Sequence, residues 1–500
     1  MPAIAGIAIV AAFSCSSGVT RQGTTISVAA DGNLQAALDQ ARPGDTIALA
    51  AGAEYRGSFT LPAKDGGDGY ITIQSSAIDR LPPGVRVSPA SAASMAKIVA
   101  TREGQPAIRT AAGAHHYKLI GLDVSPAPGV SVFDLIALGD GNQSTSAAVP
   151  HDIVIDRCYV HGLPDEPMKR AISLNSAETT IDNSHISDAK ARGQDSQAIA
   201  GWNGPGPFHI RNNHLEGAGE NVMFGGANPA IAQLVPSDIE VRGNHVVKPR
   251  RWKGGPWSVK NLFELKSARR VVVDGNVFEN NWADAQSGYA ILYNCIDDSG
   301  WARIEDVRFT NNVVAHSGSG ANIGGSNPRI GCQMATTVFR NNLWIDIDGR
   351  TWGGDGRLFQ VLGGAPGVVI DHNTGLQTGA MLSFDGAKGT HFVFTNNIAP
   401  HNEDGMMGSG AGSGISALQQ YFATWQFERN VIAGLPNGVA PSQYPTRNFF
   451  PATIAAVGLA NAAGGDSQLI ASSPFRGAGL DGKDVGVDMA ALRAALRDKY

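Results

Sequence analysis

The sequence is poor in charged residues. Of its 500 residues only 17% are Asp, Glu, Lys or Arg, and the formal net charge is -5. A chain this close to neutrality is not a general nucleic-acid binder, so any binding of anions has to be local. Sparse charge also argues against a long helical or coiled-coil protein. Glycine is plentiful instead, with 62 residues, which is typical of many short strands joined by turns.

Long apolar runs are lacking as well. The apolar stretch at residues 4–13 is too short to span a bilayer, but its length is typical of the core of a secretion signal. Residues 12–15 (AFSC) are similar to a bacterial lipoprotein cleavage box. We therefore predict a leader over residues 1–25 and a secreted, periplasmic or cell-surface protein, with a lipid on Cys15 as its one expected membrane attachment. A disordered apolar tail is the alternative.

Cysteine is scarce too, with four residues and no Cys-x-x-Cys pair, which argues against a zinc motif of the usual spacing. Cys295 and Cys332 are compatible with a disulfide between neighbouring layers of the fold. They are equally compatible with two buried thiols, and the sequence leaves both possibilities open.

What the sequence does contain is a repeat. A run of alternating apolar residues is followed by one or two polar residues, an Asn and another apolar pair, as in FHIRNNHLEG and TVFRNNLWID. The alternation predicts strands, and a spacing of roughly 24–36 residues predicts a solenoid. The last Asn of each phrase gives the series Asn213, Asn244, Asn276, Asn312, Asn342, Asn373 and Asn397.

Asn suits the repeated position for two reasons. A tight corner between strands needs a left-handed backbone, which Asn tolerates. Stacked corners would also place each amide over the next one, so that the side chains bond along the stack. Each repeat carries a third β-like run, such as YAILYNC or AMLSFDG. We therefore predict an all-β protein, a parallel β-helix with three strands per coil.

Both ends of the repeat region predict helices. Residues 34–41 form an amphipathic pattern, with Leu34, Leu38 and Ala41 on one face, and a helix there would cap the open N-terminal end. Residues 489–500 predict a second capping helix. The expected organisation is a leader (1–25), an N-terminal cap with the first coils (26–110), the β-helix with Asn corners (111–435), and a C-terminal coil with a capping helix (436–500).

The repeat and the N-terminal segment LQAALDQARPGDTIAL resemble the right-handed parallel β-helix superfamily, which includes pectate lyases and related polysaccharide-active enzymes. The resemblance covers about residues 26–500. Residues 196–226 and the segment WSVKNLFELK are similar to a bacterial subgroup of that superfamily. The paired acids, Gly-His-Gly and Arg-x-Lys of polygalacturonases are not evident. The resemblance implies a carbohydrate-active protein without specifying its reaction.

One third strand carries candidate catalytic groups. Its alternation directs Phe263 and Leu265 inward, so Glu264 and Lys266 should point outward, two residues apart. Glycines beside Lys266 in neighbouring layers would leave a trough that accepts a long polymer. The residues expected in the column of Lys266 are Asn175, Gly225, Gly363 and Asp385.

Residues 248–258 combine positive charge with indole rings and are longer than a corner requires, so we predict an inserted loop beside this strand. Arg250 and Arg251 would bind carboxylates or sulfates bidentately. Trp252 and Trp257 would stack on sugar rings or, alternatively, fold the loop onto the solenoid. Trp202, in a third strand of an earlier layer, would extend the platform. The expected partner of a monomeric protein is an acidic polysaccharide.

β-Elimination suits these residues, because it needs cations to neutralise a uronate and a base to remove its C5 proton. We name Lys266 as the first candidate base and Lys260 as the second. The resemblance implies the same, since β-helix lyases use a basic residue, often beside calcium. Glu264, Glu220 and Asn221 are candidate Ca²⁺ ligands through oxygen, and Asn221 is also a candidate substrate contact. A solvated Glu264–Lys266 ion pair of little energetic value is the alternative.

Two other functions remain open. A glycoside hydrolase on the same fold needs two carboxylates across the scissile bond, and Asp195, Glu220, Glu264 and Asp297 are its candidates. A non-catalytic polysaccharide-binding surface protein needs only the long stiff face of the solenoid, because a fold never implies a reaction.

Overall fold

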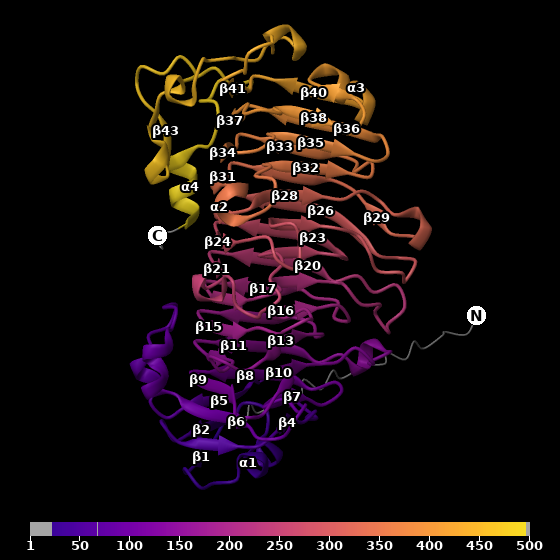
Figure 1. Ribbon diagram of the computed structural model, residues 1–500. Helices are drawn as coiled ribbons and strands as arrows, with labels where there is room; N and C mark the ends of the chain where they lie inside the picture. The colour runs from indigo at the N-terminus through magenta and orange to yellow at the C-terminus, as the bar shows by residue number, and fades with distance from the viewer. Residues whose placement is uncertain (1–22, 68, 497–500) are drawn as a thin grey trace, which may run out of the picture.

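The computed structural model of the protein describes residues 23–67 and 69–496 as one stack of coils. Figure 1 shows the coils rising in chain order from the indigo N-terminal end to the yellow C-terminal end. Each coil contributes one strand to each of three sheets, here called A, B and C, which are parallel except for the last strand of sheet C. The prediction of an all-β parallel β-helix with three strands per coil is therefore confirmed. Cys15 and nearly all of the predicted leader lie outside the described residues.

The strands of sheet A are β1 (Thr25–Val28), β2 (Thr46–Leu49), β5 (Ile71–Ser75), β8 (His115–Ile120), β11 (His151–Asp156), β14 (Thr179–Asp182), β17 (Phe208–Arg211), β20 (Ser237–Arg242), β23 (Ala268–Asp274), β26 (Arg303–Thr310), β29 (Gln333–Met334), β30 (Thr337–Arg340), β33 (Val368–Asp371), β36 (Gly389–Thr395) and β40 (Phe422–Glu428).

Those of sheet B are β3 (Glu54–Arg56), β6 (Ala96–Ala100), β9 (Leu122–Pro126), β12 (Tyr159–His161), β15 (His185–Ala189), β18 (His214–Gly217), β21 (His245–Val247), β24 (Val277–Asn281), β27 (Val313–Ser317), β31 (Leu343–Ile347), β34 (Thr374–Gln377), β37 (Ile398–Pro400) and β41 (Val431–Ala433).

Those of sheet C are β4 (Phe59–Leu61), β7 (Ile108–Thr110), β10 (Val132–Leu138), β13 (Met168–Leu174), β16 (Gln197–Gly201), β19 (Glu220–Phe224), β22 (Phe263–Leu265), β25 (Tyr289–Tyr293), β28 (Ser319–Ile323), β32 (Phe359–Leu362), β35 (Leu382–Asp385), β38 (Met406–Gly408) and β39 (Gly412–Ser413). A separate hairpin is formed by β42 (Leu459–Asn461) and β43 (Asp466–Leu469).

The predicted asparagine ladder runs along the corner between sheets A and B. The Oδ1 atom of each ladder residue accepts the main-chain N–H and the Nδ2 amide of the ladder residue one coil below, at 2.8–3.2 Å. The ladder continues past the predicted series through Asn430 to Asn448. From Asn213 to Asn430 the ladder residues are buried, so the ladder supplies hydrogen bonds that solvent cannot supply at this corner.

The backbone part of the asparagine prediction is wrong. The left-handed residue of each corner is the one before the ladder asparagine, as at Asn212 (φ 55°), Asn311 (φ 53°) and His372 (φ 53°). The chain therefore turns at one residue and directs the amide of the next residue inward. This division explains why Gly also occurs at the turning position, at Gly243 and Gly275, but not at the ladder position.

The N-terminal cap is confirmed. Helix α1 (Leu34–Gln40) begins after Asn33, whose side chain accepts the N–H of Ala36. Its face of Leu34, Leu38 and the following Ala41 is buried in the solenoid core. The helix contacts β1 and β4, and so covers the first coil.

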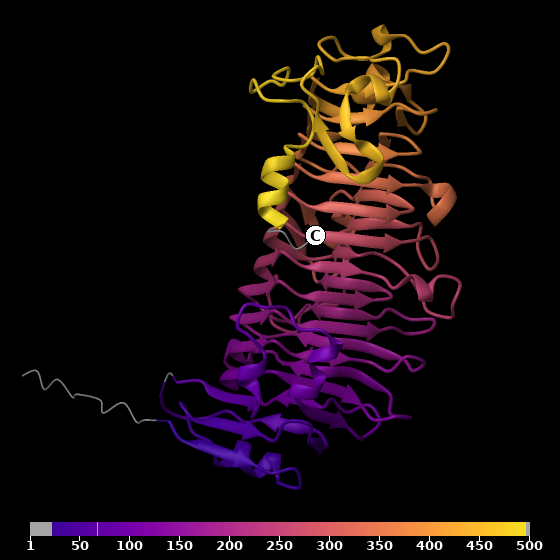
Figure 2. The same ribbon diagram turned by 90° about the vertical axis from the view of Figure 1, so that its left-hand side faces the viewer.

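The C-terminal helix is not an end cap. Helix α4 (Met489–Leu496) lies along the side of the stack, as Figures 1 and 2 show. Met489, Leu492 and Leu496 pack there with Val277 and Leu343 of sheet B. Near the C-terminal end, α3 (Ile415–Tyr421) packs instead against β38, β39 and β40. The remaining α-helix, α2 (Gly349–Trp352), is a single turn beside β27.

A second long-range contact comes from the N-terminal half. The segment between β5 and β6 (residues 76–95) leaves the first coils and reaches upward over the A–B corner. There Arg86 donates to the carbonyls of Asn212 and Gly243, 126 and 157 residues away. Two coils that are not neighbours in the stack are thereby joined directly.

Cys295 and Cys332 form a disulfide, which resolves the choice between the two possibilities left open by the sequence. Cys158 is a buried free thiol. Within the part of the chain that the structure describes, no helix is both long and apolar enough to cross a lipid bilayer.

The ladder predicts a large local cost of substitution. Replacing Asn312 with Ala leaves four buried groups of Val273, Asn276 and Asn342 without this partner. We expect Asn312→Ala to lower the free energy of unfolding by about 3 kcal/mol, measured by urea denaturation. The control is Asn142→Ala at an exposed position outside the ladder, expected to cost less than about 0.5 kcal/mol. Equal costs for the two variants would contradict this account.

Candidate functional site

The candidate site lies on the outward face of sheet C around β22. Phe263 and Leu265 are buried in the solenoid core, in register with Val222 and Phe224 of β19, as the alternation predicts. Glu264 therefore points to the opposite face. It is not solvated there, however, because only 1% of Glu264 and 8% of Lys266 are exposed. The solvated surface ion pair considered as an alternative is therefore wrong.

The strand register corrects the predicted column of Lys266. Continuing the pairing of Leu265 by one residue places Lys266 beside Gly225, as expected, and beside Asn294 in the next coil. In β32, three coils after β22, the column contains Leu362, which pairs with Asp385 of β35. Gly363 is therefore displaced from the column by one position. In the other direction the same column contains Trp202 and Asn175.

Two buried carboxylates form the centre of the site. Glu220, at the start of β19, is fully buried and its Oε2 accepts a 2.7 Å hydrogen bond from Gln197. Glu220 Oε1 and Glu264 Oε2 have no hydrogen-bond donor. Burial, followed by the charge of the adjacent Glu220 carboxylate, raises the pKa of Glu264 to about 8. Near neutral pH Glu264 is therefore largely protonated, which removes the repulsion between the two carboxyl groups.

Two lysines lie at the edge of this pair, of which Lys266 is buried and Lys260 is partly exposed. Lys266 Nζ is 3.4 Å from Glu264 Oε1. Lys260 forms an ion pair with Asp195 and lies 3.6 Å from Glu220 Oε1. Burial acts to lower the pKa of Lys260, but its hydrogen bond to Asp195 and the charge of Glu220 raise it overall. Lys260 is therefore held as an ammonium, which disfavours it as a base.

The third lysine, Lys248, was missed from the sequence as a site residue. It is fully buried and donates to the carbonyl oxygens of residues 217, 218, 219 and 261, and to Asn221 Oδ1, at 2.7–3.0 Å. Burial lowers the pKa of Lys248 to about 7, whereas the charges of Glu220 and Glu264 act to raise it. Five oxygen acceptors around one amine favour the ammonium form. Lys248 is thus a buried counter-charge for the carboxylate pair.

The structure contradicts the role predicted for Asn221. Its Nδ2 donates to the carbonyls of Leu215 and Val247, at 2.8 Å each, and its Oδ1 accepts from Lys248. The side chain is fully buried and its hydrogen bonds lie inside the protein. Asn221 is therefore neither a substrate contact nor a free metal ligand; it positions Lys248.

The two tryptophans of the basic loop do not form a sugar platform. Trp252 is 3% and Trp257 is 7% exposed, and both pack with Trp282 and Trp352 in a small cluster of their own. The buried ammonium of Lys190 lies 5.8 and 5.2 Å from the centres of their rings. The alternative, in which these rings fold the loop onto the solenoid, is what the structure shows.

The two arginines of this loop are directed away from sheet C. Arg250 donates to Asn280 of β24 and lies over the ring of Trp352. Arg251 pairs with Asp188 of β15 and Glu216 of β18, at 3.2 and 3.6 Å. Their partners belong to sheet B or its adjoining loops, so the prediction that they grip substrate beside Lys266 is not supported.

Trp202 keeps its predicted place on the sheet C face. It is partly exposed, and the guanidinium of Arg170 lies 4.9 Å from its ring centre. On the other side of Lys266, the same face is hollowed by a cavity of about 260 Å³. Its lining includes Asn294 and Leu292, the neighbours of Lys266 and Glu264 in the next coil. Trp202, Lys266 and the cavity therefore follow one line along the stack.

The shape of the floor comes from glycine. A side chain at Gly226 would meet Lys266 Cδ at 3.0 Å and its Nζ at 3.6 Å, so the lysine lies against bare backbone. Gly225 and Gly226 have φ of 86° and 89°, a conformation open to glycine but costly for other residues. The glycine predicted beside Lys266 is therefore present, and the lysine side chain occupies the space above Gly226.

Comparisons with known proteins agree with the fold. No protein-family model matches the chain, and no curated protein matches it. Among solved structures, a mannuronic acid-specific polysaccharide family 6 lyase from human gut microbiota matches with 12% identity and a TM-score of 0.51, covering 85% of this chain and 91% of that one. The PL6 family alginate lyase AlyGC matches with 15% identity and a TM-score of 0.54, covering 85% of this chain and 53% of that one.

These likenesses and the three parallel sheets identify the fold as that of the right-handed parallel β-helix superfamily. At such low sequence identity, the likeness concerns the fold and does not transfer a reaction.

The raised pKa of Glu264 predicts how stability depends on pH. The proton on Glu264 stabilises the folded state below the ordinary pKa of about 4.5, and this contribution is lost as pH rises through about 8. We expect the wild type to lose a few kcal/mol of unfolding free energy relative to Glu264→Gln between about pH 5 and about pH 8. Urea denaturation across this range measures the difference.

The matched control for this experiment is Asp238→Asn. The hydrogen bond from Arg270 lowers the pKa of Asp238, so this group stays ionised in both states over the same range. The difference in unfolding free energy between this control variant and the wild type should not change with pH. A difference that is flat for Glu264→Gln as well would show that Glu264 does not keep its proton in the folded state.

Proposed function

We propose that the protein is an exported, monomeric polysaccharide lyase that cleaves an acidic, uronate-containing polysaccharide by β-elimination. The observation that carries this proposal is the position of Lys266. Its amine lies on a glycine floor on the outer face of the solenoid, in line with Trp202 and with a cavity, and beside a buried pair of carboxylates.

The reaction needs a base that reaches the C5 proton of a uronate. In this proposal the neutral amine of Lys266 takes that proton, a C4–C5 double bond forms and the C4–O4 bond breaks. The Lys260 ammonium, held charged by Asp195, supplies the proton that the departing O4 oxygen takes up. The two lysines thus divide the roles of base and acid between them.

The rest of the face is suited to holding a chain. The ring of Trp202 offers an apolar surface to a sugar, and Arg170 beside it offers a guanidinium to a carboxylate. The cavity of about 260 Å³ beyond Lys266 is lined by polar groups such as Asn294, Asn322 and Ser326. An extended chain that runs along the stack would contact all three parts.

A calcium ion is part of the proposal. The chemistry of the donor set fits it, because Glu220 Oε1, Glu264 Oε2 and Asn261 Oδ1 are buried oxygens without hydrogen-bond donors. Glu220 and Glu264 would hold the ion. Asn261 replaces Asn221, which the sequence analysis named as a calcium ligand. When bound, the ion would neutralise the substrate carboxylate. Because it competes with the proton of Glu264, its binding should tighten as pH rises towards about 8.

The structural neighbours support the choice of substrate to test first. Both are described as lyases, one as an alginate lyase and the other as specific for mannuronic acid. Alginate and its mannuronate blocks are therefore the first polymers to try.

The hydrolase alternative finds less support. Glycoside hydrolases hold their carboxyl groups about 5 Å apart or more, on either side of the bond. Glu220 and Glu264 interact directly and lie below the lysines, while Asp195 is tied to Lys260. Asp297 is buried and its Oδ1 accepts from Ser299. No two of these four carboxylates therefore face each other as a free pair across the outer face of sheet C.

The proposal is tested by following unsaturated uronate and new reducing ends together, on alginate, pectate and glucuronan, with calcium and with chelator. We expect both signals to rise, and we expect Lys266→Met to lower kcat by about 100-fold or more while the polymer still binds. The control is Lys388→Met, an exposed lysine outside the site, which should keep full activity.

Three results would contradict the proposal. Full activity of Lys266→Met would remove this lysine as the base. Reducing ends without unsaturated products would make the protein a hydrolase. Binding without any cleavage, in all metal conditions, would show that the sheet C face is a non-catalytic polysaccharide-binding surface.

A further inference from the structure

A second group of chemically active side chains lies on sheet A, several coils away from Lys266. It is formed at the starts of β8 and β11, where His151 pairs with His115 in the strand register. The next residues, His116 and Asp152, are therefore neighbours, and Glu178 follows in the adjoining coil. Left-handed corners of this kind recur throughout the stack. What distinguishes this corner is its set of side chains.

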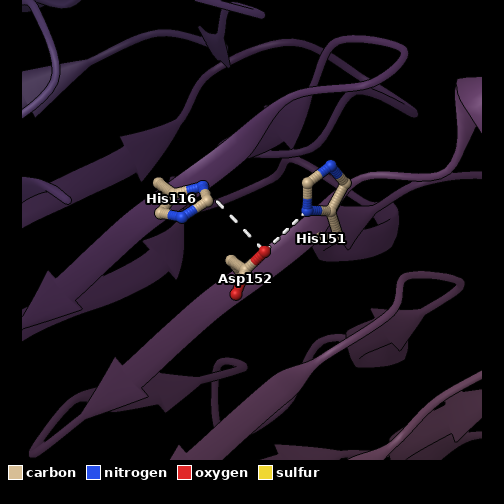
Figure 3. A group of neighbouring side chains, drawn as sticks. All are labelled: His116, His151 and Asp152. Atoms are coloured by element: carbon tan, nitrogen blue, oxygen red, sulfur yellow. Dashed lines mark hydrogen bonds and ion pairs between the residues drawn. The ribbon is translucent and has the colours of Figure 1, made fainter. Parts of the chain in front are cut away.

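The donor atoms of three residues converge here, as Figure 3 shows. Asp152 Oδ2 lies 2.7 Å from His151 Nδ1 and 3.9 Å from His116 Nδ1. One ligand atom from each of the three residues lies within 4.8 Å of the others. In a tetrahedral zinc site, donors at the usual bond lengths are roughly 3.4 Å apart. The two measured distances fall on either side of this value, so small side-chain rotations suffice to close around an ion.

The ring planes also suit coordination. His116 and His151 are inclined at 79° to each other, so their lone pairs are not forced to run parallel. His115 lies against both rings: its ring stacks on His151 with the ring centres 5.0 Å apart, and its Nδ1 is 2.8 Å from His116 Nδ1. An ion bound by His116 Nδ1 would take the place of this second contact.

Another group with suitable residue types, on sheet B, lacks this geometry. His185 and His214 are stacked 4.2 Å apart with their planes inclined at only 5°, so their in-plane lone pairs run side by side. Both nitrogens of His214 are already engaged, by His245 at 3.2 Å and Glu216 at 3.0 Å. This second group provides a control rather than a site.

The charge around Asp152 favours a cation. Within residues 23–67 and 69–496, the ion-pair partners found for Asp152 are the histidines His116 and His151. The carboxyl group of Glu178 lies beside Asp152 in the strand register, which adds a second oxygen donor group at this corner. The three side chains are partly open to solvent, with exposures of 19%, 41% and 23%, so an ion can enter and can keep a water ligand.

We propose that His116, His151 and Asp152 bind a divalent transition-metal ion, with Zn²⁺ as the reference ion and water or Glu178 as a further ligand. Two imidazoles and one carboxylate suit zinc and its neighbours, whereas calcium prefers oxygen ligands alone. This site is therefore independent of the calcium proposed between Glu220 and Glu264. The ion joins β8 to β11, two strands of adjacent coils, and binds the folded chain selectively.

The experiment is a titration of metal-free full-length protein with ZnCl₂. Binding is measured by isothermal calorimetry and by the shift in Tm. We expect Zn²⁺ to raise Tm in proportion to the logarithm of its concentration, and Ca²⁺ to leave this site unfilled. Asp152→Asn and His151→Gln should each weaken Zn²⁺ binding by at least about 10–100-fold. Asn keeps the left-handed backbone of position 152 (φ 54°), so this variant is expected to fold.

The matched control is His214→Gln in the second histidine group, which should bind Zn²⁺ like the wild type. The Tm values in chelator show whether each variant folds, and His151→Gln serves if Asp152→Asn does not. X-ray absorption of the zinc-loaded wild type should show about two imidazole ligands together with oxygen. Unchanged affinity in both variants, or a loss confined to His214→Gln, would overturn the proposal.

Discussion

The stack depends on a constraint that each coil imposes on the next: buried polar groups at the corner must find partners in a neighbouring coil. The amides from Asn213 to Asn448 meet this requirement by bonding both to each other and to main-chain groups. A slip of one residue would break these bonds and reverse every side chain of a strand. The register is therefore well defined, and a residue's column predicts its neighbours several coils away.

The site follows from this register. Because β19 and β22 pair without a shift, Met223 and Glu264 share one column, and Gly225 falls beside Lys266. The ionisable groups nearby come in matched numbers: Glu220, Glu264 and Asp195 are acids, and Lys248, Lys260 and Lys266 are bases. All of them except Asp195 and Lys260 are buried. Burying so many ions is unfavourable unless each has partners, and Lys248 has five. Such a cluster is better explained by a chemical role than by stability.

The sequence correctly predicted which face of a strand each side chain points to, but it did not predict how deeply the side chains are buried. The period of two placed Phe263 and Leu265 in the core and Glu264 on the other face, and the recurring Asn predicted the ladder. The sequence could not show that Glu264 is covered, because the groups that cover it come from other coils. Nor could it show that Lys248, which follows the short strand β21, turns inward to meet carbonyls at residues 217–219. The loop tryptophans misled for the same reason, since Trp282 and Trp352, which bury them, are remote in sequence.

Solenoids usually unfold as chains of near-independent units, in which each coil is coupled only to its neighbours. Arg86 breaks this rule, because it joins the segment after β5 to the corners at residues 212 and 243, and α4 does the same from the other end by packing on Val277 and Leu343. The segment after β5 and helix α4 thus reduce the number of coils that can unfold independently of the rest of the stack. Their contacts also fix the number of coils between the points they join, so that evolution by gain or loss of a coil is restricted in this region.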